Sequence, residues 1–212
     1  NTARCSPSRA SLVTGLHPHQ TGIGILTNDD RPVGYPGSLN DRCVTMAEAL
    51  AGAGYATFLA GKWHLSSDVW NPSGSWPTRR GFQGFYGTLT GCGSYFWPGT
   101  LTRGEQPAEP EPLGREYYYT DAISDEATLF VRRQAREAPG QPFFLYVAHV
   151  APHWPLHALP QDIHSYTGIF DAGWDVLRER RMERLVESGL VPPGTPLSMR
   201  DPSQPAWSVE PN

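Results

Sequence analysis

A cysteine and an arginine near the start of the 212-residue chain have the spacing of an anion site. Ser6 and Pro7 follow Cys5 and predict a helix start, with Ser6 as the N-cap and Pro7 at the first helical position. The unpaired N–H groups and the positive dipole end of such a helix attract anions. Arg9, one turn further on, can donate two hydrogen bonds to a tetrahedral oxyanion. One alternative is a small buried cysteine; a phosphatase-like nucleophile needs a longer loop between Cys5 and Arg9.

Lys62 and His64 form a second candidate cluster. They follow the apolar run 55–60, which predicts a buried strand, and ligand sites of α/β sheets lie outside the carboxyl ends of strands. Both side chains can donate a hydrogen bond to an anionic substrate. The alternative is a solvated loop lysine and a histidine that packs beside Trp63.

Three histidines follow a second apolar run at spacings of four: His149, His153 and His157. On one helix face this spacing could hold zinc, but Pro152 and Pro155 break any such helix. We expect His153, in a rigid turn, to be functional and the other two to be structural. Cations and N–H donors thus gather at strand ends around Cys5, an arrangement that suits an anionic ester such as a sulfate or phosphate.

The elements that must position these residues alternate between helix and strand. Residues 45–48 form a capping box, and Gly15 is a helix stop. The stretch 80–98, rich in glycine and aromatic residues, is expected to be surface architecture. Helix followed by strand, twice, predicts an α/β layered fold. The first predicted helix begins directly after Cys5. The second runs from residue 45 to residue 52 or 54, and two more span 121–137 and 175–188. The predicted strands span 55–60 and 143–148.

Composition excludes several classes of protein. The 22 glycines and 21 prolines show no three-residue period, which excludes collagen and implies long structured loops. An aromatic content of 11% excludes a disordered chain. A net charge of −4 gives no electrostatic case for binding nucleic acid, and no run approaches the ~20 apolar residues of a membrane span. Three cysteines make no disulfide framework and leave the compartment open.

Three motifs, in order along the chain, resemble the type I (formylglycine-dependent) sulfatases and the bacterial arylsulfatases among them. Residues Cys5–Gly15 resemble the motif Cys-x-Pro-x-Arg with its Leu-Thr-Gly-like continuation, and Gly61–Leu65 resembles the second family motif. Residues Ala151–Leu156 match the segment that supplies the sulfate-binding histidine. The resemblance implies an alkaline-phosphatase-like layered sandwich, a central mixed sheet flanked by helices. Residues 1–212 would be a partial catalytic domain, incomplete at both ends, with the Pro-rich tail 189–212 continuing into absent sequence.

The resemblance also implies the chemistry, the hydrolysis of a small-molecule or sugar sulfate ester. A formylglycine-generating or anaerobic sulfatase-maturating enzyme would convert Cys5 to formylglycine, whose hydrate attacks sulfur while bound to a divalent metal, calcium or sometimes magnesium. Arg9 would position the hydrate, and Lys62 and His153 would bind sulfate and the leaving-group region. His64 would contact the nucleophile and act as the base. Cys5, as formylglycine, would be a metal ligand.

The remaining metal ligands of the family, an upstream Asp-Asp pair and a downstream Asp-Asn pair, are expected to be absent from this chain. Asn28, Asp29 and Asp30 are interpreted as a loop with turn chemistry. The chain alone is therefore expected to be inactive. Two alternatives stay open: a phosphate or phosphonate monoester hydrolase of the same superfamily, and an inactive truncated anion-binding domain.

Overall fold

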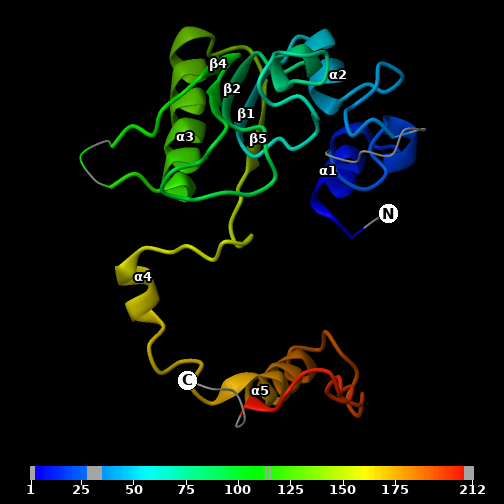
Figure 1. Cartoon of the computed structure of the whole chain (residues 1–212), viewed down its shortest axis with the longest axis vertical. Coiled ribbons are helices and arrows are strands. Elements are labelled where there is room, and N and C mark those ends of the chain that lie inside the picture. The colour runs from blue at the N-terminus through cyan, green and yellow to red at the C-terminus, as the bar shows by residue number, and fades with distance from the viewer. Residues whose placement is uncertain (1–2, 28–34, 113, 115, 208–212) are drawn as a thin grey trace. The chain divides into compact units, whose positions relative to one another are not determined.

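The computed structural model describes residues 3–27, 35–112, 114 and 116–207 (Figure 1). The chain divides into two compact units, residues 1–157 and 158–212. The first unit carries all of the candidate site residues. The interpretation of Asn28, Asp29 and Asp30 as a turn falls outside the described residues.

A five-stranded mixed sheet forms the centre of the first unit. Its order is β4-β3-β2-β1-β5, in which β1 runs parallel to β2 and β5 while β3 is antiparallel to β2 and β4. The two predicted strands are confirmed as β1, shifted by one residue, and β5. The strands are β1 (Ala56–Gly61), β2 (Gly84–Thr88), β3 (Leu101–Arg103), β4 (Gln106–Pro107) and β5 (Phe143–Ala148).

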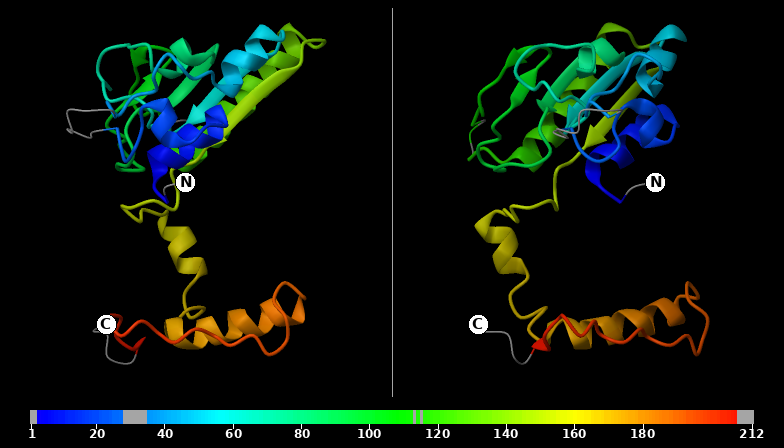
Figure 2. Two further views of the ribbon diagram at one scale, coloured as in Figure 1. Left: turned by 90° about the vertical axis from the view of Figure 1, so that its right-hand side faces the viewer. Right: turned by 45° about the vertical axis from the view of Figure 1, so that its right-hand side comes forward.

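Helices cover both faces of this sheet (Figures 1 and 2). Adjacent β1 residues point to opposite sides, as the period of a strand requires. Leu59 packs in one core with residues of α1 and α2, while Ala60 packs in the other core with Ile123 of α3. The helical elements of this unit are α1 (Cys5–Thr14), η1 (Pro18–Thr21), α2 (Met46–Gly52), η2 (Pro77–Arg80) and α3 (Tyr119–Glu137).

The expectation that the stretch 80–98 is surface architecture is wrong. It contains β2, whose residues Phe85 and Tyr86 are 2% and 6% exposed and belong one to each core. A short strand between two glycines gives no long apolar run, so burial here depends on pairing with β1. Gly87 lies so close to β1 that a Cβ would meet Gly61 O at 1.7 Å.

The start of α1 also differs from its prediction. Cys5 is the first helical residue and Arg4, with extended backbone, is the N-cap. Ser6 was expected to cap the helix, but it lies inside the first turn, buried, and its hydroxyl has no hydrogen-bond partner in the described part of the chain. Gly15 does end the helix, with φ 71° and its N–H donating to Ser11 O at 2.8 Å.

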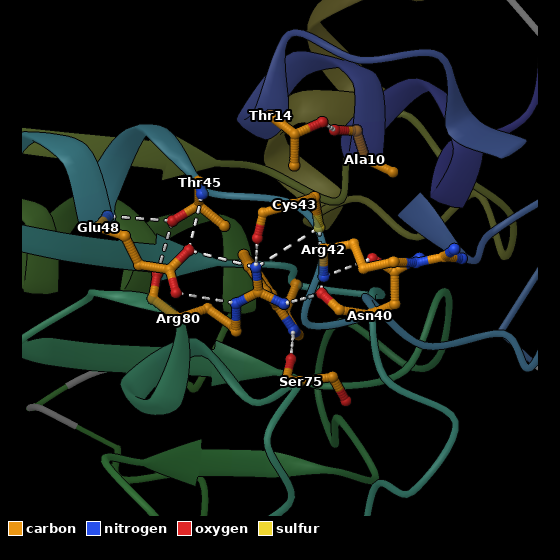
Figure 3. A network of polar contacts seen from close by, with 10 residues as sticks. Ala10, Thr14, Asn40, Arg42, Cys43, Thr45, Glu48, Ser75 and Arg80 are labelled. Atoms are coloured by element: carbon orange, nitrogen blue, oxygen red, sulfur yellow. Dashed lines mark hydrogen bonds and ion pairs between the residues drawn. The ribbon is translucent and has the colours of Figure 1, made fainter. Parts of the chain in front are cut away.

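A buried arginine joins α2 to the segment that precedes β2 (Figure 3). Thr45 and Glu48 form the predicted capping box, and Glu48 also accepts from Arg80, which is 4% exposed. Arg80 further donates to the carbonyls of Asn40 and Cys43. These hydrogen bonds of the Arg80 guanidinium hold α2 against the sheet. Cys5, Cys43 and Cys92 are all free thiols.

The second unit contains α4 (Pro160–Ser165) and α5 (Gly173–Glu187). α5 confirms the predicted helix with a start two residues earlier and an end one residue earlier. Its apolar residues Leu177, Met182 and Leu185 are only half-buried. Gly173 is buried because the Trp207 ring covers it. In the part of the chain that the structure describes, no helix is long and apolar enough to cross a membrane.

Candidate active site

Lys62 directly follows β1, and backbone hydrogen bonds to both neighbouring strands hold the chain in place there. Its N–H donates to Ala148 O of β5 at 2.8 Å, and the N–H of Trp63 donates to Thr88 O of β2 at 2.9 Å. Gly61 takes φ 116°, and a Cβ there would meet Ala148 O at 2.2 Å. The strand end therefore projects Lys62 and His64 from a rigid backbone, as predicted for a ligand site.

The Lys62 ammonium is buried beside Cys5. The residue is 2% exposed, and this burial lowers the pKa of Lys62, while the charge of Cys5 and a hydrogen bond to Cys5 raise it. Arg9 lowers it further through like-charge repulsion, and Cys92 raises it. The structure thus brings Cys5, Arg9 and Lys62 together, from the first turns of α1 and the end of β1.

Arg9 joins α1 to two strand ends. Its Nη1 donates to Lys62 O at 2.7 Å and to the Tyr146 hydroxyl of β5 at 3.1 Å. Sequence reasoning gave Arg9 roles toward an oxyanion and toward the nucleophile, and it passed over Tyr146, one hydroxyl in an apolar strand. Arg9 therefore also fixes the distance between the helix start and the backbone that carries Lys62.

His64 is a buried, strained and neutral imidazole. It is 9% exposed and takes φ 57°, the left-handed region that few side chains other than glycine adopt. Burial, followed by the charges of Lys62, Arg9 and His153, lowers the pKa of His64 to about 3. Its Nδ1 is buried without a hydrogen-bond partner among the described residues. Such an orphaned buried nitrogen is typical of a group poised for a partner that binds later.

The His64 ring packs against Gly91, which lies in the loop after β2. A Cβ at Gly91 would lie 2.2 Å from His64 Cε1, so any larger residue displaces the ring. Nothing in the sequence pointed to this contact, because the two residues come from different strand ends.

His153 lies in the turn after β5, and its charge acts on His64. The side chain is exposed, and its Nδ1 is 2.7 Å from Trp154 O. His157 Nδ1 accepts the backbone N–H of Tyr95 at 3.3 Å, a contact that agrees with a structural role. His149 is exposed. The structure thus gathers Cys5, Arg9, Lys62, His64 and His153 within the first unit.

A calcium or magnesium site needs several oxygen ligands. Among the described residues, no three or more histidine, cysteine or acidic side chains form a group that could hold a metal ion. The charged groups that act on His64 are Lys62, Arg9 and His153, all of them basic. The described side chains therefore fit an anion and do not by themselves fit such a metal.

The sequence profile of the sulfatases matches residues 1–201 of the chain. The chain belongs to the sulfatase family. The match covers the three motifs, the whole first unit and residues 158–201 of the second, and family membership supports a metal and a formylglycine residue in general.

The sulfatase relatives are longer than this chain. It is 33% identical over 210 residues to an uncharacterized sulfatase of Schizosaccharomyces pombe, with 89% of the chain and 36% of the relative covered. It is 32% identical over 203 residues to the arylsulfatase of Klebsiella aerogenes, with 91% and 42% covered. The chain therefore spans about two fifths of the length of these curated relatives.

A solved structure confirms the predicted fold class. The crystal structure of Ps i-CgsB in complex with k-i-k-neocarrahexaose superposes with a TM-score of 0.63 at 28% identity, over 78% of this chain and 38% of that one. The mixed sheet with helices on both faces is thus part of an alkaline-phosphatase-like sulfatase fold.

The lowered pKa of His64 predicts a loss of stability in acid. The unfolded chain titrates this histidine near 6.5 and the folded chain near 3, so between these values the unfolded state binds more protons. Stability contributed by neutral His64 is present above pH 6.5 and is lost as pH falls toward 3. Between pH 6.5 and 4 the protein should lose about 3 kcal/mol of unfolding free energy that His64→Gln does not lose. Urea unfolding at several pH values measures the difference, and equal slopes for both proteins would contradict it.

Proposed function

We propose that the protein is a sulfuric ester hydrolase of arylsulfatase type, with residues 1–212 forming part of its catalytic domain. The observation that carries this proposal is the convergence of Cys5 with Arg9, the buried Lys62 ammonium and two histidines at the ends of parallel strands. A site of this composition binds a tetrahedral anion next to a single reactive residue. Family membership supports the choice of sulfate.

Residue 5 carries the reaction in this proposal. As formylglycine hydrate, made by a separate formylglycine-generating or anaerobic maturating enzyme, it supplies the hydroxyl nucleophile and a second hydroxyl that later releases sulfate. Cys5 is half-buried at the first position of α1. Residue 5 is therefore partly accessible from solvent.

Lys62 and Arg9 stabilise negative charge. The Lys62 ammonium lies out of water beside residue 5, and a preorganised cation in such a place stabilises developing charge far better than one in solvent. It donates hydrogen bonds to sulfate oxygens. Arg9 is anchored through Nη1 to the backbone of Lys62, and it orients residue 5 with the rest of its guanidinium.

The two histidines are given different tasks. His64, with its pKa lowered to about 3, is neutral at physiological pH and keeps a lone pair that can accept the proton of a residue 5 hydroxyl. His153 Nδ1 is 2.7 Å from a carbonyl oxygen, which accepts only, so Nδ1 carries a hydrogen and Nε2 is left for the substrate. His153 Nε2 is the atom that contacts sulfate or the leaving oxygen.

The substrate class and the metal complete the proposal. We propose an aryl or sugar sulfate as the substrate. The similarity to the Klebsiella aerogenes arylsulfatase and to Ps i-CgsB, solved with k-i-k-neocarrahexaose, supports this class. Family membership supports a metal in general, and we propose calcium, with magnesium as the alternative. Cys5, once converted, is its proposed ligand in this chain.

Matched aryl esters, assayed with the full-length protein of which residues 1–212 form a part, test the reaction class. We expect p-nitrophenyl sulfate to be hydrolysed with a kcat/KM about a hundredfold above that of p-nitrophenyl phosphate, because the site is proposed to be shaped for a monoanion. Mass spectrometry of the peptide that contains residue 5 first establishes its conversion. Faster phosphate hydrolysis would favour the phosphomonoesterase alternative, and a converted protein that hydrolyses neither ester would contradict the proposal.

A further inference from the structure

Tyr95 is a buried tyrosine to which the proposed reaction assigns no role. It lies in the loop between β2 and β3 and is 2% exposed. Its hydroxyl donates to the backbone carbonyl of His153 at 2.7 Å. A hydrogen bond from a buried aromatic side chain to a turn carbonyl restrains the backbone at that position, because the ring is itself packed in the core.

The same residue also holds the far end of the turn. The Tyr95 N–H donates to His157 Nδ1 at 3.3 Å, and the two rings meet edge to face with centroids 5.9 Å apart. The Tyr118 hydroxyl donates to His157 O at 3.2 Å. Tyr95 is itself held from the start of α3, where the N–H of Tyr119 donates to its carbonyl at 2.7 Å. The turn 153–157 is therefore clamped at both ends.

The His153 turn needs such support. His153 is exposed, and its other described hydrogen bonds stay within the local chain: its N–H donates to Val150 O at 3.0 Å and its Nδ1 pairs with Trp154 O. Neither bond ties the turn to the sheet or to α3. The Tyr95 hydroxyl supplies a link from a distant part of the chain.

The loop that carries Tyr95 contacts both candidate histidines. Its Gly91 backbone abuts the His64 ring, four residues before Tyr95. One loop thus sets the position of the neutral His64 and of the exposed His153. A catalytic group displaced by about 1 Å can cost about a hundredfold in rate, so a residue that fixes such a loop controls turnover without touching the substrate.

We propose that Tyr95 is a positioning residue whose hydroxyl holds the backbone of His153 so that its imidazole stays at the sulfate site. The expected effect of Tyr95 on turnover rests on the proposed function. Its expected effect on the position of His153 rests on the contacts alone.

Tyr95→Phe removes the hydroxyl and keeps the ring. We expect kcat for an aryl sulfate to fall about ten- to a hundredfold with little change in KM. The double variant Tyr95→Phe/His153→Ala should be no slower than His153→Ala, because the hydroxyl then has nothing left to position. Tyr117→Phe is the matched control, since it deletes another buried tyrosine hydroxyl bond, to Tyr86, away from the turn. It should leave kcat unchanged.

NMR signals of the His153 imidazole separate failure of this role from failure of the function. In Tyr95→Phe these signals should shift and broaden, and in Tyr117→Phe they should not. A wild-type protein that hydrolyses no sulfate ester but shows this shift would overturn the function and keep the positioning role. An active Tyr95→Phe with wild-type kcat and unmoved His153 signals would overturn the role, as would additive losses in the double variant.

Discussion

Cys5→Ala is expected to abolish sulfate ester hydrolysis. Alanine cannot be converted to formylglycine, so the site keeps its cations and loses its nucleophile. Removing the nucleophile of a hydrolase costs about a millionfold in kcat. The fold should persist, because Cys5 is a half-buried first residue of α1 and the cores contain Ala10 and Val13 instead. Initial rates with p-nitrophenyl sulfate, together with circular dichroism, measure both halves of the expectation.

An aldehyde probe and a second cysteine variant make this result specific. A hydrazide reagent should label the wild-type protein at residue 5 and should not label Cys5→Ala. Cys92→Ala removes an exposed thiol and leaves residue 5 intact, so it should retain labelling. Turnover by Cys5→Ala near that of the wild type would sink the proposed mechanism.

Local chemistry made several elements predictable from the sequence. The capping box of Thr45 and Glu48 forms because each side chain satisfies a backbone group of the same turn. The stop at Gly15 depends on its own positive φ. The strand 143–148 has the predicted bounds because its apolar run ends where the turn begins. Each of these signals lies within a few residues of the feature that it specifies.

What sequence reasoning missed depends on contacts between distant segments. β2 is buried through pairing with β1, and its Gly87 is required by the approach of Gly61 rather than by any local turn. Ser6 has the local signals of an N-cap, yet α1 starts at Cys5, two residues before the expected first helical residue Pro7, and buries Ser6. In these places tertiary packing decides between conformations that the local sequence leaves nearly equal.

The candidate site divides in the same way. The motifs placed Cys5, Lys62 and His153 at a helix start and two strand ends, and the structure brings them into one site. The left-handed backbone of His64, its seat on Gly91 and the bond from Tyr95 to His153 had no sequence signal. Motif reasoning therefore finds the groups that are proposed to face an anion, while the groups that hold them in place emerge only from the fold.

Lys62→Met is expected to separate catalysis from stability at one position. Methionine fills the same buried space without a charge, so the protein loses its buried cation next to residue 5. We expect kcat to fall about 10²–10³-fold, the loss typical of one transition-state donor. The free energy of unfolding should not fall, because the ammonium is desolvated, as its lowered pKa records, and an apolar side chain removes that penalty. Steady-state kinetics and urea unfolding measure the two quantities on the same sample.

The backbone contacts of Lys62 make the comparison clean. Its backbone N–H donates to Ala148 O, and its backbone carbonyl accepts from Arg9. A side-chain change keeps both hydrogen bonds, so the end of β1 keeps its place in the variant. Lys62→Arg is the matched charged control: it keeps a cation, but its planar fork needs a different geometry, so we expect it to recover only part of the lost rate. A Lys62→Met protein that is stable and fully active would show that the buried ammonium does not serve the reaction. A variant that is less stable and equally active would assign Lys62 to the fold alone.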